Sequence, residues 1–151
     1  MDAQAAVTAI LTALNIEPVT VNLNPVEGRL HLDLTVSEVD SGILIGFHGE
    51  TIEAIQTLLS LMVNHGKTEY TPIMFDVNGY RQKRLTSLEA LAQRAADQAV
   101  ESGREIILPP LNAFERRHIH LKLESDARVS TYSEGEGDAR RLIISPKAPL
   151  A

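Results

Sequence analysis

The first 78 positions of the chain carry two different spacings of apolar residues. Between residues 3 and 14 apolar side chains recur at i, i+3, i+4 and i+7, which predicts an amphipathic helix. Residues 19–23 and 30–36 instead alternate apolar and polar side chains, and turn-forming residues separate the two stretches. This alternation predicts two strands, each with one buried face.

A glycine pair separates these strands from the next periodic segment. The apolar run Ile43–Ile45 leads into Gly46–Gly49, which reads Gly-Phe-His-Gly, and an apolar stripe follows at residues 52–62. The stripe predicts a helix that closes near Asn64, and a third alternating stretch at residues 73–77 predicts another strand. The expected order is therefore helix, strand, strand, glycine loop with helix, and strand.

After residue 79 the composition shifts towards alanine, glutamine, arginine and leucine. Residues 80–102 place leucine and alanine on one side and stop before Gly103, which predicts a long helix that joins two domains. Asn112 and Glu115 resemble a capping box that opens another helix to about Leu123. Short strands are predicted at residues 106–108, 129–132 and 142–144.

The composition is that of a folded protein without disulfides. Of 151 residues, 44% are hydrophobic and 23% are charged, which suffices for one core or for two small ones. The absence of cysteine excludes disulfide bonds and thiolate metal sites. No apolar run reaches the length of about 18 residues expected of a membrane helix, and the first residues do not resemble a signal peptide. We therefore expect a soluble cytoplasmic protein without membrane insertion.

The formal net charge of the chain is −6, and the charged residues are distributed unevenly along it. Residues 1–78 hold two basic side chains, Arg29 and Lys67, against ten acidic ones, for a net charge of −8. Residues 79–151 hold twelve basic and ten acidic side chains, for a net charge of +2. Because local clusters of charge set the attraction to phosphate, only the second half is suited to bind a polyanion.

The glycine loop is the first candidate binding feature, and it comprises Gly46, Phe47, His48 and Gly49. Two glycines at the entry of a helix allow backbone amides to approach a phosphate that a Cβ would hold off. The loop has no lysine or arginine between its glycines, and Phe47 could stack on a base or fill a protein interface. A simple strand-to-helix turn is the alternative interpretation.

The second candidate is a basic cluster around the segment ERRHIH. Arg116 and His120 are four residues apart, so on a helix they emerge on one face and could contact adjacent phosphates. Residues from the last two strands would join them if the helix packs beside those strands. The predicted contact residues of this cluster are Arg116, Arg117, His120, Thr131, Ser133, Arg140 and Arg141. A solvated basic helix face is the alternative.

Other chemistries find little support in the sequence. His118 and His120 are two residues apart and point to different sides of a helix, so they are poor joint metal ligands. The glycine loop lacks the lysine of a nucleotide-binding P-loop, and no nucleophile-elbow pattern surrounds Ser133. We therefore expect no catalytic residues, no metal site and no cofactor.

Two resemblances cover most of the chain. The segment I-G-F-H-G followed by a helix makes residues 3–78 resemble a KH domain of type II, whose glycine loop clamps single-stranded nucleic acid against a groove. The segments NAFERRHIHLKL and VSTYSEGEGDARRLIISP make residues 85–146 resemble the R-3-H domain, a binder of single-stranded nucleic acid named for its Arg-x-x-x-His pair. A KH domain followed by an R-3-H domain resembles the bacterial Jag family, also described as SpoIIIJ-associated, KhpB-like or EloR-like proteins. The resemblance does not extend to the N-terminal Jag domain of many members.

The resemblance implies an α+β fold in which a type II KH-like domain, with helices on one face of a three-stranded sheet, is joined by a long helix to a small α/β R-3-H domain. We expect the boundaries to be 1–78 for the KH-like domain, 79–146 for the R-3-H domain and 147–151 for a frayed tail. The implied partner is single-stranded RNA, or single-stranded DNA, bound by a post-transcriptional or cell-elongation regulator. A protein-interaction module that docks a partner KH protein through its acidic half is the alternative, and the oligomeric state stays open.

Overall fold

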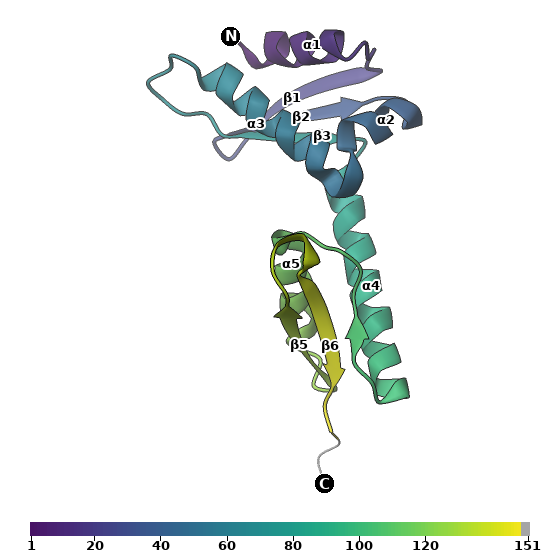
Figure 1. The fold of residues 1–151 in the computed structure, drawn as a ribbon. Coiled ribbons are helices and arrows are strands. Elements are labelled where there is room, and N and C mark those ends of the chain that lie inside the picture. The colour runs from purple at the N-terminus through teal and green to yellow at the C-terminus, as the bar shows by residue number, and fades with distance from the viewer. Residues whose placement is uncertain (149–151) are drawn as a thin grey trace. The chain divides into compact units, whose positions relative to one another are not determined.

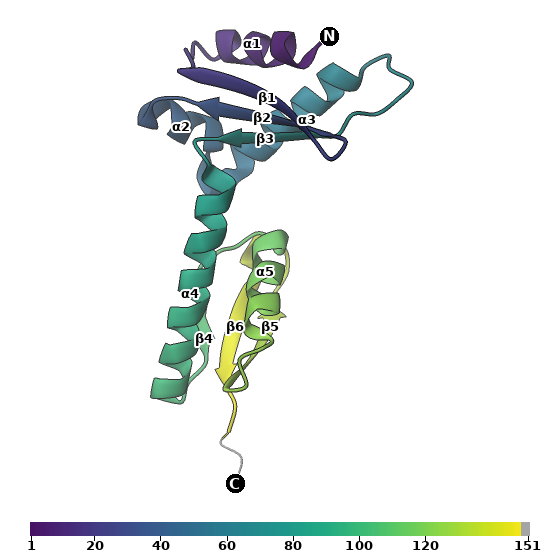
Figure 2. The ribbon, with the colours of Figure 1, turned by 180° about the vertical axis from the view of Figure 1, so that it is seen from behind.

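The structure is a computed structural model, and it describes residues 1–148. The chain divides after Gln82 into two compact units, Met1–Gln82 and Lys83 onward, and each unit has its own three-stranded sheet and its own hydrophobic core (Figures 1 and 2). The expected frayed tail at residues 147–151 lies for the most part outside the described residues.

The first unit has the order helix, strand, strand, helix, helix, strand. Its sheet has the order β1-β2-β3, in which β1 and β2 are antiparallel and β2 and β3 are parallel. A short 3-10 turn, Phe47–Gly49, lies between the second and third helices. The elements are α1 (Ala3–Ala13), β1 (Thr20–Val26), β2 (Arg29–Thr35), α2 (Glu38–Ile45), α3 (Glu50–Asn64) and β3 (Ile73–Val77).

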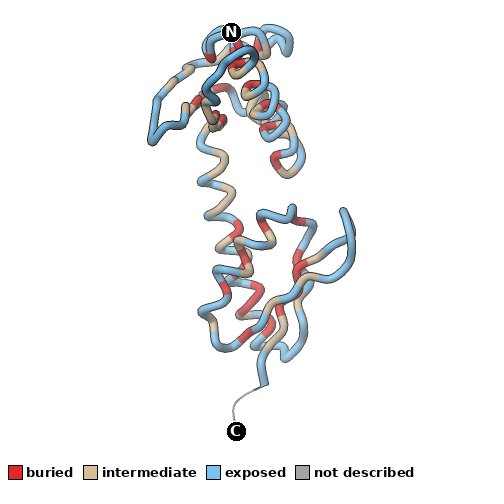
Figure 3. Tube along the Cα trace, turned by 90° about the vertical axis from the view of Figure 1, so that its left-hand side faces the viewer, coloured by how far each residue is buried: buried red, intermediate tan, exposed pale blue. Residues whose placement is uncertain are grey.

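The three helices share one face of this sheet. The strand register pairs Leu32 with Phe75 and Leu34 with Val77, so these four side chains point to the same side, and all four are buried. They form one core with buried residues of all three helices, among them Leu59 of α3. Buried positions accordingly alternate along the strands and recur along the helices (Figure 3). The expectation of helices on one face of a three-stranded sheet is confirmed.

The structure corrects the predicted order of elements. It contains a helix, α2, where the sequence indicated only a short apolar run at Ile43–Ile45. The side chain of Ser37 accepts a hydrogen bond from the Asp40 amide at 3.2 Å and so starts the helix. Only Leu44 of its eight residues is buried, which is why the segment shows no helical stripe of apolar residues. The pair Ser37 and Asp40, spaced as in a capping box, was the signal for this helix in the sequence.

The second unit packs two helices on a small antiparallel sheet with the order β4-β6-β5. Small residues of α4, such as Ala92 and Ala96, allow close packing against Ile119, Leu142 and Ile144, and all of these are buried. A 3-10 turn at Gly137–Ala139 links the last two strands, which are longer than predicted. The elements are α4 (Tyr80–Ser102), β4 (Ile106–Ile107), α5 (Ala113–Leu123), β5 (Val129–Glu134) and β6 (Arg141–Pro146).

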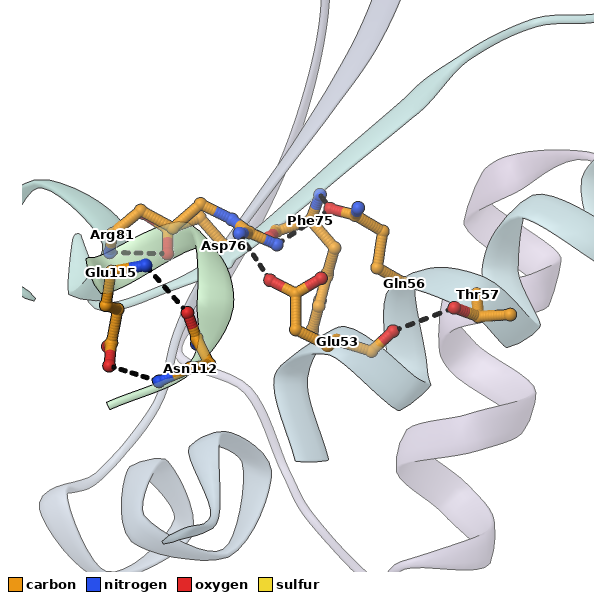
Figure 4. Close-up of polar contacts among 8 residues, drawn as sticks. All are labelled: Glu53, Gln56, Thr57, Phe75, Asp76, Arg81, Asn112 and Glu115. Atoms are coloured by element: carbon orange, nitrogen blue, oxygen red, sulfur yellow. Dashed lines mark hydrogen bonds and ion pairs between the residues drawn. The ribbon is translucent and has the colours of Figure 1, made fainter. Parts of the chain in front are cut away.

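A guanidinium holds the first turn of α4 to its neighbours within the first unit. Arg81 donates from Nη1 to Glu53 Oε1 at 2.7 Å, from Nη2 to Gln56 Oε1 at 2.8 Å and from Nε to the carbonyl of Phe75 at 3.0 Å (Figure 4). Its backbone amide also bonds Asp76 Oδ1 at 3.2 Å. Four bonds from one residue thus fix the start of α4 against α3 and β3.

In the second unit a buried carboxylate, Glu115, connects the start of α5 to α4. Glu115 is 3% exposed, and it accepts from Arg84 Nε at 2.7 Å and from the Asn112 amide at 3.2 Å. The Glu115 amide in turn donates to Asn112 Oδ1 at 2.8 Å (Figure 4). The predicted capping box is therefore present, and through Arg84 it also ties the start of α5 to α4.

Candidate nucleic-acid interface

An open pocket of about 390 Å³ lies between α5 and the last two strands of the second unit. In the strand register Thr131 lies opposite Ile144 and Ser133 opposite Leu142, and both partners belong to the core under α5. The hydroxyls of Thr131 and Ser133 therefore lie on the sheet face that α5 covers. The lining residues are Ala113, Arg116, Arg117, His120, Thr131, Tyr132, Ser133, Arg140 and Leu142.

Six of the seven residues predicted for the basic cluster line this pocket, and Arg141 does not. Arg141 precedes the core residue Leu142 on β6, so its side chain leaves the opposite face of the sheet. Its Nη1 donates to the carbonyl of Asp138 at 2.6 Å and to that of Arg140 at 3.1 Å. The expected grouping of Arg141 with the other cations is therefore corrected.

The Arg116 and His120 side chains face the pocket but already have protein partners. Arg116 Nη1 donates to the carbonyl of Leu111 at 2.5 Å and so holds the segment before α5. His120 Nδ1 bonds Thr131 Oγ1, and its Nε2 lies 3.7 Å from Glu124 Oε1. Some of the polar groups of Arg116 and His120 therefore make contacts within the protein, and fewer of them remain for a ligand than the sequence alone suggested.

Arg117 and Arg140 are the cations of the pocket that are most available to a ligand. Both are exposed, and the side chain of Arg117 makes no hydrogen bond or ion pair with another residue in the range 1–148. The side chain of Arg140 donates one bond, from Nη1 to the carbonyl of Gly135 at 2.9 Å. No acidic residue of the described range lines the pocket. Unpaired guanidinium groups beside hydroxyls are suited to contact phosphate oxygens.

Basic residues elsewhere in the second unit include several that are neutralised by carboxylates. Arg128 Nη2 lies 2.9 Å from both Asp97 and Asp126, and Lys122 lies 3.6 Å from Glu89. The hydrogen bonds from Arg128 lower the pKa of Asp126 below its usual value of 3.8, and the same bonds raise the pKa of Arg128. The pocket cations differ because they have no such counterions among their lining neighbours.

Tyr132 is a lining residue of the pocket that was not predicted from the sequence, but it lies between Thr131 and Ser133 on β5, so its side chain leaves the opposite face of the sheet. Its hydroxyl donates to Glu105 Oε1 at 2.9 Å, and this hydrogen bond to a carboxylate raises the pKa of Tyr132 above 10. The neutral tyrosine is therefore the form that the fold stabilises.

Replacing Tyr132 by phenylalanine is expected to reduce the dependence of stability on pH in alkaline solution. The raised pKa means that the Tyr132 contribution is complete below pH 10 and is lost as the pH rises through the higher folded value. Thermal melts of both proteins at pH 8 and pH 11 measure the effect. The difference in Tm should be larger at pH 8, and an equal difference at both values would contradict the assignment.

The glycine loop of the first unit links two helices, not a strand and a helix. Gly46 has φ +70° and ψ −173°, a conformation essentially restricted to glycine, and a Cβ there would lie 2.0 Å from Thr51 Oγ1. A Cβ on Gly49, at φ +78°, would meet the Tyr80 ring at 3.1 Å. Local packing therefore requires both glycines, independently of any ligand.

Of the two residues between the glycines, Phe47 is presented to solvent and His48 is half-buried. Phe47 is 71% exposed, and its ring centroid lies 4.0 Å from that of His48, with the planes tilted by 55°. Glu50 and Glu53 occupy the following first turn of α3, and Glu53 is paired with Arg81. The loop thus offers an aromatic surface but no arginine or lysine of its own.

Neither a metal cluster nor a membrane span is found in the part of the chain that the structure describes. Between residues 1 and 148 no three histidine, aspartate or glutamate side chains lie together in a way that could hold a metal ion. No helix in this range combines the length and the apolar character needed to cross a membrane.

Comparison with known families agrees with the division of the chain. Residues 4–73 match the family described as KhpA/KhpB, KH domain, and residues 86–146 match the R-3-H domain. The first match runs from α1 to Ile73, the first residue of β3, and the second covers most of α4 and the whole sheet that bears the pocket.

Curated relatives of the chain share one name. The chain is 38% identical over 129 residues to "RNA-binding protein KhpB" of Clostridium symbiosum, which covers 85% of this chain and 57% of the relative. The proteins of the same name from Lactiplantibacillus plantarum and Bacillus subtilis are 33% and 38% identical, over 84% and 71% of this chain and 39% and 52% of theirs. The chain spans about half the length of these relatives. The KH and R-3-H domains in this order, together with these relatives, show that the chain belongs to the Jag family of KhpB-like proteins.

Proposed function

We propose that this chain binds single-stranded RNA, with the pocket between α5 and β5 as its main contact and the glycine loop as an auxiliary one. The observation that carries the proposal is the convergence of Arg117, Arg140 and His120 with two hydroxyls in a pocket without acidic lining among the described residues. The similar proteins named for RNA binding support it. This activity suits a cytoplasmic post-transcriptional or cell-elongation regulator that acts without catalysis.

Binding by these residues depends mainly on contacts to the phosphate backbone of the RNA, and less on contacts to its bases. Each guanidinium can donate two parallel bonds to a phosphate, and the hydroxyl of Ser133 can donate a third. His120 is held in place by Thr131, so its ring is oriented before the ligand arrives. A ligand held by phosphate contacts must bind more weakly at higher salt, because the release of its condensed counterions becomes less favourable.

The experiment is a titration of a fluorescently labelled single-stranded RNA of 12 nucleotides with the full chain at 50, 100 and 200 mM KCl. We expect the logarithm of the association constant to fall linearly with the logarithm of salt concentration. The double-stranded form of the same RNA serves as the comparison, and it should bind more weakly. Absence of binding to the single strand at 50 mM KCl would contradict the proposal.

A specific observation favours the protein-docking alternative for the first unit. Val39, Ile43 and Phe47 follow one another at intervals of four residues along α2 and the loop, and they are 76%, 53% and 71% exposed. Exposed apolar residues of this kind on an acidic unit are suited to a protein partner. This docking would need no RNA, so pull-down of a partner KH protein by the full chain after ribonuclease treatment distinguishes it from RNA-bridged association.

A further inference from the structure

We infer that Phe114 is a base-stacking residue that extends the proposed RNA site beyond its phosphate contacts. This inference rests on the proposed function, because it concerns the same ligand. Phe114 is the second residue of α5 and is 67% exposed. Its neighbour Ala113 lines the pocket, and so does Arg117, which lies three residues further on and therefore next to it on the helix surface.

The ring of Phe114 is held from one side. It stacks on His118 with an angle of 18° between the planes and a centroid separation of 6.3 Å, an offset arrangement. His118 Nε2 in turn lies 3.3 Å from Glu89 Oε1 on α4. Since Glu89 and His118 fix the ring on one side, the aromatic side chain loses less freedom when a second ring packs against it.

The position of Phe114 also matches what a bound strand would require. The bases of a strand whose phosphates lie on Arg117 and Arg140 project from its backbone, and an exposed aromatic beside Arg117 offers a base an apolar surface. Stacking of this kind accepts any base, because each base has a π-face. The expected ligand is thus single-stranded RNA of mixed sequence, with at least one unpaired base beside the phosphates that Arg117 contacts.

Leu121 provides a matched control on the same helix. It lies four residues beyond Arg117, is 53% exposed and has a side chain that cannot stack as a ring does. An effect of general surface hydrophobicity would appear at both positions, whereas stacking would appear at Phe114 alone.

The affinity test compares Phe114→Ala with Leu121→Ala in the RNA titration at 50, 100 and 200 mM KCl. We expect Phe114→Ala to bind about tenfold more weakly with an unchanged salt slope, because a stacked base carries no phosphate charge. Leu121→Ala should bind as the parent chain does. If the parent binds RNA and Phe114→Ala binds equally well, or if both variants lose the same affinity, stacking by Phe114 is refuted while RNA binding stands. If the parent chain itself does not bind, the proposed function fails as well.

A spectroscopic test reports on the contact directly. The chain contains no tryptophan, so Phe114→Trp introduces a single indole fluorophore, and Leu121→Trp gives the matched probe. Saturation with the 12-nucleotide RNA should quench the fluorescence of the first variant strongly and that of the second weakly. An abasic oligonucleotide of the same length should leave both nearly unchanged. Equal quenching by the abasic strand would show that no base reaches the ring, and would overturn the inference.

Discussion

Replacing Arg84 by methionine is expected to lower the free energy of unfolding of the second unit by about 3 kcal/mol. Glu115 would then remain 3% exposed with the Asn112 amide as a donor but without its cation at 2.7 Å. An uncompensated buried charge is costly, whereas the methionine keeps the aliphatic packing of the arginine stem. Urea denaturation of the full chain, followed by circular dichroism, measures the change.

Two further variants separate the buried charge from other effects of the substitution. Arg94→Met removes the same charge from an exposed position of the same helix, and it should change the stability by less than about 0.5 kcal/mol. Adding Glu115→Gln to Arg84→Met should recover part of the loss, because the glutamine is neutral and can still accept from Asn112. Equal losses for Arg84→Met and Arg94→Met would show that the ion pair contributes nothing.

The helices and strands with a strong apolar period could be predicted from the sequence. Helices α3 and α4 and strand β3 bury one regular set of side chains, and periodicity records burial directly. Helix α2 buries only Leu44 and exposes Val39 and Ile43, so its apolar residues do not lie together on one buried face of the helix. A helix that contributes one residue to the core leaves little trace in an apolar pattern, and its cap at Ser37 remains the better signal.

The candidate site could be predicted only as far as local spacing determines it. Helical geometry fixes Arg116 and His120 on one face, and the structure places both at the pocket. Arg140 and Arg141 are adjacent, and which of them faces α5 depends on where β6 begins and on its register with β5. That register follows from the tertiary packing of Leu142 and Ile144, so it could not be derived from the motif alone.

Reversing the charge of both Arg117 and Arg140 is expected to weaken RNA binding more than any change in the glycine loop. Each lost phosphate contact should lower the salt slope by roughly one unit, and so the double variant Arg117→Glu/Arg140→Glu should lower it by about two. Charge-assisted bonds of this kind contribute about 1.5 kcal/mol each, which makes the expected loss at least about a hundredfold at low salt. Both side chains are exposed, so the fold should persist in circular dichroism spectra.

A matched control distinguishes the loss of specific contacts in the pocket from the effect of a changed net charge. Arg94→Glu/Arg104→Glu reverses two exposed arginines of the same unit that do not line the pocket, and it should reduce affinity only slightly. A loss as large as that of the pocket variant would mean that overall charge, and not the pocket, attracts the RNA.

The comparison with the loop decides which domain carries the affinity. Phe47→Asp/His48→Asp adds two charges to a half that already has ten acidic and two basic side chains, so it has little electrostatic attraction to lose. We expect its salt slope to stay near that of the parent chain and its affinity to fall less than that of Arg117→Glu/Arg140→Glu. The reverse order, in which the loop variant abolishes binding while the folded pocket variant binds as the parent does, would assign the RNA to the KH domain. We would then expect Arg117 and Arg140 in the pocket to bind a different ligand.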